Sequence, residues 1–226
     1  MPDQLPSLLS AVVADGFNLQ QWQAGSILGA MVGAALTKLM HNRLEAARAI
    51  FLEELRAGEV SLPPSQIDEG VAILCRYLRA AQEGTARRNL RLMAKVIAGQ
   101  ARLGNLWADE FLHDADMIAS LRREEIILLA TVHQIWASDW LKDKEEGEKV
   151  GAAFARASTQ LSPSLFRDAE EMEATAASLT RTGLLVSVSL WGPIGYRPTP
   201  KLERLVSLAP LSEVLAQEEG GVEAAS

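Results

Sequence analysis

The chain has 226 residues, 48% of them apolar, and a formal net charge of −7 at pH 7. The apolar share supports a packed core and excludes a disordered protein, while the negative charge disfavours generic nucleic-acid binding, which depends on phosphate contacts. A single cysteine, Cys75, excludes an intramolecular disulfide, and the first residues lack the basic segment of a signal peptide, so we expect a cytoplasmic protein.

Glycines and prolines divide the first half into predicted helices. A long helix spans about Leu19 to Ala57 and ends before Gly58. Its apolar residues recur every three or four positions, which predicts one buried stripe: Leu36, Met40, Leu44, Ala47, Phe51 and Leu55. Three more helices should follow, starting at the polar caps Ser65, Thr85 and Asn105. Cys75, one step from the apolar face of its helix, is expected to be buried.

The second half begins with a helix capped by Ser120 and reaching Trp140. Its middle, Ile126–Ala130, is apolar nearly all round, which predicts the most buried helix of the protein. A weaker helix follows near 144–157, and another begins at Ser162-Pro163 or at Asp168 and ends at Gly183.

A short hairpin and a last helix follow. Residues 186–190 alternate as a half-buried strand does, and the chain returns through Tyr196-Arg197-Pro198. Thr199 should cap the next helix, with Pro200 at its first position. This order of helices, glycine cap, hairpin and helix over about 122–209 resembles the winged-helix superfamily. Together with the helices predicted for the first half, this resemblance implies a mainly α protein, with an N-terminal helical bundle followed by a winged-helix-like module that contains one β-hairpin.

In DNA-binding winged helices, the third helix enters the major groove and the wing contacts phosphates. Here the front of that helix carries Asp168, Glu170, Glu171 and Glu173, which would repel phosphate. Its later exposed candidates are Thr175, Ser178 and Arg181. The candidate wing residues are Trp191, Tyr196 and Arg197. Protein docking or dimerisation is therefore favoured over duplex recognition.

Three glycines spaced by four, Gly25, Gly29 and Gly33, lie in the apolar segment 24–36. Glycine at this spacing leaves a flat groove that another helix can approach closely. The segment is shorter than the roughly 20 apolar residues that cross a bilayer. Close helix packing, within the chain or between copies, is therefore favoured, and membrane contact through 24–36 is an alternative.

Basic residues gather in one stretch of the sequence, which predicts either an anion or nucleic-acid patch or pairing with acidic residues at 109–116. The candidates are Arg76, Arg79, Arg87, Arg88, Arg91 and Lys95, followed by Arg102. The net negative charge favours pairing.

We find no sequence pattern that predicts catalysis. Glu110 and His113 have the Glu-x-x-His spacing of dimetal helical bundles, but no second copy of the motif exists. There is no phosphate-binding glycine loop, nucleophile elbow or Cys-x-x-Cys motif. We therefore expect no enzyme activity, no cofactor and no metal.

These observations predict a helical domain over 1–120, a winged-helix-like domain over 121–210 and an acidic frayed tail over 211–226. The layout also resembles loosely that of the abortive-infection alpha family of bacterial proteins, which implies a phage-defence setting. The expected function is that of a non-enzymatic interaction or regulatory protein that binds a protein partner or itself as a homo-oligomer. The alternatives are a DNA-binding transcriptional regulator and a membrane-associated phage-defence effector.

Overall fold

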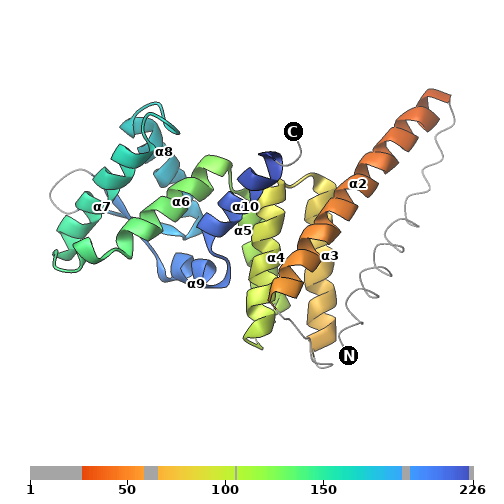
Figure 1. Ribbon diagram of the computed structural model, residues 1–226, viewed down its shortest axis with the longest axis horizontal. Coiled ribbons are helices and arrows are strands. Elements are labelled where there is room, and N and C mark those ends of the chain that lie inside the picture. The colour runs from red at the N-terminus through yellow and green to blue at the C-terminus, as the bar shows by residue number, and fades with distance from the viewer. Residues whose placement is uncertain (1–26, 59–65, 105, 190–193, 224–226) are drawn as a thin grey trace. The chain divides into compact units, whose positions relative to one another are not determined.

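The computed structural model describes the backbone of residues 27–58, 66–104, 106–189 and 194–223, and their side chains except at 27–35, 67 and 219–223. The described chain is mainly helical with one two-stranded antiparallel hairpin, which confirms the predicted fold class at that level (Figure 1). It divides into two compact units, an N-terminal unit, Met1–Ala119, and a C-terminal unit, Ser120–Ser226.

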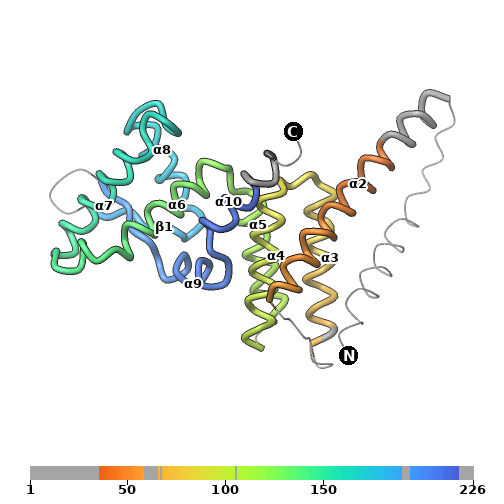
Figure 2. Tube along the Cα trace, viewed as in Figure 1, coloured from red at the N-terminus to blue at the C-terminus, as the bar shows by residue number. Residues whose placement is uncertain are grey.

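The described N-terminal unit is a group of four helices. They are α2 (Ile27–Ala57), α3 (Ile67–Glu83), α4 (Arg87–Arg102) and α5 (Ala108–Ser120). Helix α2 packs on both α3 and α4, which lie side by side (Figure 1 and Figure 2). Twelve of the 16 residues of α4 are buried, which is more than in α6. The apolar run 126–130 had predicted that α6 would be the most buried helix, and this prediction was wrong. The reason is that other helices cover α4 on several sides, whereas Ile127 and Ala130 remain partly exposed.

The stripe predicted on α2 is buried in its second half. Leu44, Ala47, Phe51 and Leu55 are all buried, as expected. Leu36 was expected to share this face, but it is 53% exposed. The helical repeat is correct, but in Figure 1 the N-terminal half of α2 extends past the ends of α3 and α4.

Two predictions for the following helices were wrong. Cys75 is exposed, because one step away from the apolar face of α3 already turns a side chain toward solvent. Thr85 does not cap α4; Ala86 occupies that position and makes no side-chain cap. The end of α3 is as predicted, since Gly84 closes it in the left-handed conformation at φ 90°.

The predicted caps Ser65 and Asn105 lie outside the described residues. Helix α3 has Gln66 at its N-cap. Helix α5 begins at Ala108, and the backbone N–H of Ala108 donates to the carboxylate of Glu69 on α3 at 2.5 Å. The Glu69 side chain of a neighbouring helix thus accepts the backbone N–H that a capping side chain close in sequence would otherwise bind.

The C-terminal unit contains five helices and the hairpin in its described part. The elements are α6 (Arg123–Trp136), α7 (Glu146–Leu161), α8 (Ala169–Leu179), β1 (Leu185–Val188), β2 (Gly195–Pro198), α9 (Pro200–Leu208) and α10 (Leu211–Glu223). Short 3-10 turns cover Asp139–Leu141 and Thr180–Thr182. In the hairpin, Leu185 lies opposite Pro198 and Val188 lies opposite Gly195.

Several local signals place these elements where the sequence predicts. Asp168 caps α8 by accepting from the N–H of Glu171 at 2.8 Å. Gly183 is left-handed at φ 71° and precedes β1. Thr199 accepts from the N–H of Leu202 at 3.3 Å, with Pro200 at the first position of α9.

The bounds of α6 differ from the prediction at both ends. The helix begins at Arg123, with Arg122 rather than Ser120 as its N-cap, and it stops at Trp136 before Trp140. The N–H of Arg122 donates to the Glu125 carboxylate at 2.8 Å, so the cap is supplied from inside the helix.

The prediction of a frayed tail from residue 211 was also wrong. Leu211–Glu223 forms α10, and it packs on α6. Leu211 and Val214, three residues apart, are 1% and 0% exposed. Burial of this apolar pair stabilises a helix in an otherwise acidic segment.

Candidate functional site

The structure separates the basic residues that are close together in the sequence. Arg91 is 7% exposed and pairs with the Glu54 carboxylate of α2 at 2.7 Å. Lys95, one turn further along α4, contacts the other oxygen of the same carboxylate at 3.2 Å. These two cations neutralise a buried charge between α2 and α4, so they do not face solvent as a binding surface.

The remaining members of the basic stretch lie in different surroundings. Arg76 contacts Asp116 of α5 at 2.6 Å, which is pairing with the acidic stretch. Arg79, Arg87 and Arg102 are exposed, and Arg88 is half-buried. The candidates therefore include solvent-exposed, half-buried and core side chains.

The Glu-x-x-His pair lies on α5. Glu110 is half-buried and His113 is exposed. Within the part of the chain that the structure describes, no three histidine, cysteine or carboxylate side chains lie together as a metal site would require.

The glycine motif lies at the edge of the described chain. Gly25 is outside it, while Gly29 and Gly33 belong to the backbone of α2. Just after them, Leu36 and Leu39 are 53% and 46% exposed. In the described residues, no helix is long and apolar enough to cross a membrane. Leu36 and Leu39 thus present large apolar side chains to solvent.

The three candidate wing residues differ in where the structure places them. Trp191 lies outside the described residues. Tyr196 was expected at the wing surface, but it is 3% exposed and its ring lies 5.1 Å from that of Phe154 on α7. Burial, and then the nearby Glu173 carboxylate, raise the pKa of Tyr196. Arg197 contacts Glu146 of α7 at 3.5 Å.

The close approach of the hairpin to α7 explains this inward placement. A Cβ added at Gly195 would lie 2.5 Å from a methyl carbon of Val150, so only glycine lets β2 come this close. The neighbouring Tyr196 then enters the core of the C-terminal unit. The hairpin therefore offers less side-chain surface than its sequence suggests.

The supposed recognition face of α8 differs from the prediction as well. Thr175, expected on the exposed side, is 8% exposed and therefore buried. The hydroxyl of Ser178 donates to the buried carboxylate of Glu125 on α6 at 3.0 Å, and Arg181 lies 3.7 Å from the same carboxylate. The exposed side of α8 contains Glu170, Ala174 and Ala177. Thr175 and Ser178 are therefore largely removed from the surface, whereas Arg181 remains exposed as predicted.

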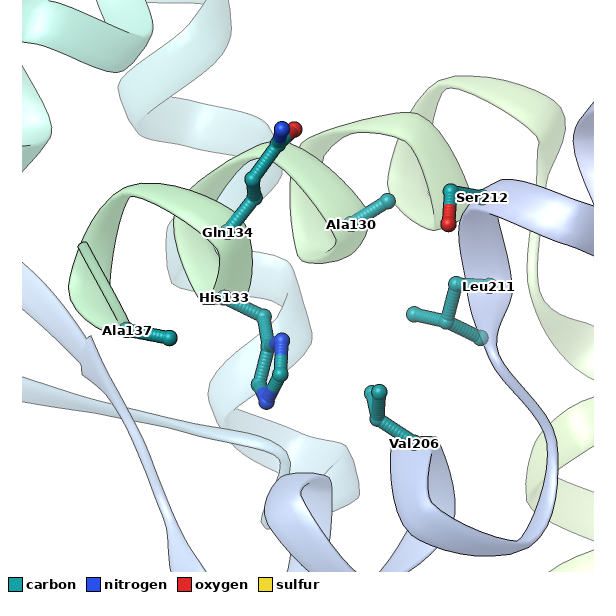
Figure 3. A pocket seen from close by; sticks show the side chains of 7 residues that line it. All are labelled: Ala130, His133, Gln134, Ala137, Val206, Leu211 and Ser212. Carbon is teal, nitrogen blue, oxygen red and sulfur yellow. The ribbon is translucent and has the colours of Figure 1, made fainter.

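A groove of about 360 Å³ lies between α6, α9 and α10 (Figure 3). It is lined by Ala130, His133, Gln134, Ala137, Val206, Leu211 and Ser212. In Figure 3 the imidazole of His133 points from α6 toward the space beside Val206 and Leu211, while Gln134 points to the other side of the helix. Burial lowers the pKa of His133, and the carboxylate of Glu203 opposes this in part.

Sequence reasoning did not identify this groove. The chain has three histidines, and no motif surrounds His133. The residues that form the other wall, Val206 and Leu211, come from the final two helices and follow no recognisable spacing from it. A signal for the site arises only when the three helices pack. No family model, curated protein or solved structure matched the chain.

Proposed function

We propose that the protein is a non-enzymatic interaction protein that associates with a second copy of itself through the N-terminal half of α2. The observation that carries this proposal is the exposure of Leu36 and Leu39 at 53% and 46%, on a helix whose later apolar residues are buried. An exposed apolar patch of this kind is typical of a protein–protein contact.

The composition of α2 supports self-association. From Ile27 to Thr37 the helix has no charged residue, and the first charge is Lys38. The segment 27–40 would extend about 20 Å at 1.5 Å per residue. Water solvates exposed apolar side chains such as those of Leu36 and Leu39 poorly, and covering them with an apolar surface is favourable.

The glycine spacing favours a second copy as the occupant. Gly29 and Gly33 lie one helical turn apart and present no side chain. When two identical helices cross there, each supplies the small-residue groove that the other requires, which is the symmetry of an isologous dimer. The proposal therefore needs no partner other than this chain.

Mass measurement by light scattering tests the proposal. The wild-type protein should show a concentration-dependent increase in mass toward a dimer. The double variant Leu36→Gln/Leu39→Gln should remain a monomer with unchanged helical circular dichroism, because it removes exposed apolar area and leaves the core intact. Asn42→Gln, at an exposed position of the same helix, is the matched control and should dimerise as the wild type does.

Gly29→Leu gives a second test of the same contact. A side chain at this position should hold the two helices apart, so the mutant should lose mass while it keeps its helical circular dichroism. A wild-type protein that is monomeric at every concentration, or a double variant that still dimerises, would contradict self-association through α2. Binding of the wild type to lipid vesicles, lost in the double variant, would favour the membrane alternative instead.

We also propose, as part of this function, that the C-terminal unit is a winged-helix-like module that docks protein in a cytoplasmic setting. The chain order α6, α7, α8, β1 and β2 supports the module, and β2 packs on both α6 and α7. Its exposed α8 face, with Glu170 and alanines, disfavours contact with phosphate. Retention on a DNA column that depends on Arg181 and Arg197 would overturn this assignment.

A further inference from the structure

We infer that the groove beside His133 is a binding site for an uncharged small molecule with an apolar body and a hydrogen-bond donor. This site lies in the C-terminal unit and is independent of self-association through α2. Its volume of about 360 Å³ falls within the usual size of small-molecule sites.

The walls of the groove match the apolar body of such a ligand. Ala130 and Ala137 line it from α6, and Val206 and Leu211 line it from the opposite side. The short side chains of Ala130 and Ala137 leave space on either side of the His133 imidazole (Figure 3). A flat ring system would contact aliphatic groups on both sides there.

The polar lining indicates an uncharged ligand. The lining residues include His133, Gln134 and Ser212 but no lysine, arginine, aspartate or glutamate. Because burial favours the neutral imidazole, His133 adds no charge of its own near neutral pH. A negatively charged ligand would lose its hydration in this groove without gaining a positive charge among the lining residues. The carboxylate that acts on His133, that of Glu203, lies outside the lining, so a positively charged ligand gains no direct partner there.

His133 supplies the hydrogen-bonding group. Among the described residues, neither of its ring nitrogens takes part in a hydrogen bond with another side chain or with the backbone. One nitrogen of a neutral imidazole carries a proton and the other accepts one. The accepting nitrogen can therefore receive an N–H or O–H from a ligand held against Val206 and Leu211.

Indole is a suitable probe, because it combines a flat apolar body with one N–H donor. In a nuclear magnetic resonance titration, indole should shift the imidazole signals of His133 and the methyl signals of Val206 and Leu211 in a saturable way. Indole-3-carboxylate, which adds a negative charge, should bind at least about tenfold more weakly because the lining offers no countercharge.

Two pairs of variants locate the binding. His133→Phe removes the acceptor and keeps the size of the ring, and it should weaken indole binding about three- to tenfold. Its matched control, His113→Phe on the exposed side of α5, should leave the affinity unchanged. Ala130→Leu should fill the groove and abolish binding, whereas Ala174→Leu, at an exposed position of α8, should not.

Unfolding curves show whether each variant is folded, so a loss of binding can be assigned to the groove. The site assignment is overturned if indole gives no saturable shift in the folded wild type, or if the same shifts persist in folded Ala130→Leu. Equal affinity for indole and indole-3-carboxylate would overturn the uncharged class of ligand. These outcomes do not depend on the mass of the protein, so they are separate from the test of α2.

Discussion

Each unit of the described chain has one buried glutamate, and the two glutamates are stabilised in different ways. Glu54 in the N-terminal unit and Glu125 in the C-terminal unit are 4% and 0% exposed. Glu54 contacts two cationic side chains of another helix, Arg91 at 2.7 Å and Lys95 at 3.2 Å. Glu125 accepts a backbone N–H from Arg122 at 2.8 Å and the hydroxyl of Ser178 at 3.0 Å.

The difference shows which kind of structure each carboxylate supports. The contacts of Glu54 join α2 to α4, so its charge helps set how two helices pack. Glu125 lies in the first turn of α6, where the helix dipole favours a negative charge, and it contacts α8 in addition. The exposed guanidinium groups of Arg122 and Arg181 lie further away, at 3.6 and 3.7 Å. The nearest contacts of Glu54 are therefore ion pairs with another helix, whereas those of Glu125 are hydrogen bonds.

The largest effect is expected when the cation that is most buried beside Glu54 is removed. Arg91→Met should lower the free energy of unfolding by about 3 kcal/mol, because a buried carboxylate then keeps only Lys95 as a partner. Chemical denaturation measures this change. Arg79→Met, at an exposed position of α3, should change stability by less than about 0.5 kcal/mol.

A double variant sharpens this comparison. Glu54→Gln/Arg91→Met removes both buried charges, so it should recover part of the stability that Arg91→Met loses. If Arg91→Met alone is as stable as the wild type, the ion pair does not hold α2 against α4.

A smaller effect is expected at the second carboxylate. Glu125→Gln keeps the shape and one acceptor oxygen but removes the charge, so it should cost about 1–2 kcal/mol in unfolding experiments. Glu124→Gln, at the neighbouring position of α6, is the control and should cost less. A loss as large as that of Arg91→Met would mean that the two arginines near Glu125 contribute more than their distances suggest.

The smallest effects on stability are expected from changes in pH, and a different side chain is responsible in each unit. Burial raises the pKa of Tyr77, which lies near Arg91 and Glu54, so the folded protein keeps this proton above pH 10.0 while the unfolded chain loses it. Stability should therefore fall as the pH rises above about 10. Tyr77→Phe should flatten this alkaline dependence, although it also loses the 2.9 Å bond to the Ala47 carbonyl at every pH.

The stability of the C-terminal unit should instead fall toward acidic pH. Burial lowers the pKa of His133 below 6.5, so the unfolded chain takes up a proton that the folded protein does not. Stability is fully present above that pH and should fall as the pH drops through it. His133→Phe should reduce this dependence, as measured by denaturation between neutral and mildly acidic pH. An unchanged slope in the variant would place the responsible group elsewhere.

Features that depend on neighbouring residues in the chain could be predicted from the sequence. The three- and four-residue repeat from Leu44 to Leu55 predicted a buried helix face, since a helix turns once in 3.6 residues. Gly183 and Thr199-Pro200 predicted the start and the end of the hairpin, because their backbone preferences act locally. The mainly helical class with one hairpin followed from such signals.

Other features were decided by the tertiary structure, because they depend on how far each neighbouring element reaches. Leu36 continues the same repeat as Leu44, yet it is exposed because α3 and α4 do not extend that far. Tyr196 is buried because Gly195 lets the hairpin approach α7. The basic stretch is divided by Glu54 and Asp116, and the groove beside His133 forms from three helices. Local preferences carry no information about these partners, since contacts between distant segments form only when the helices pack.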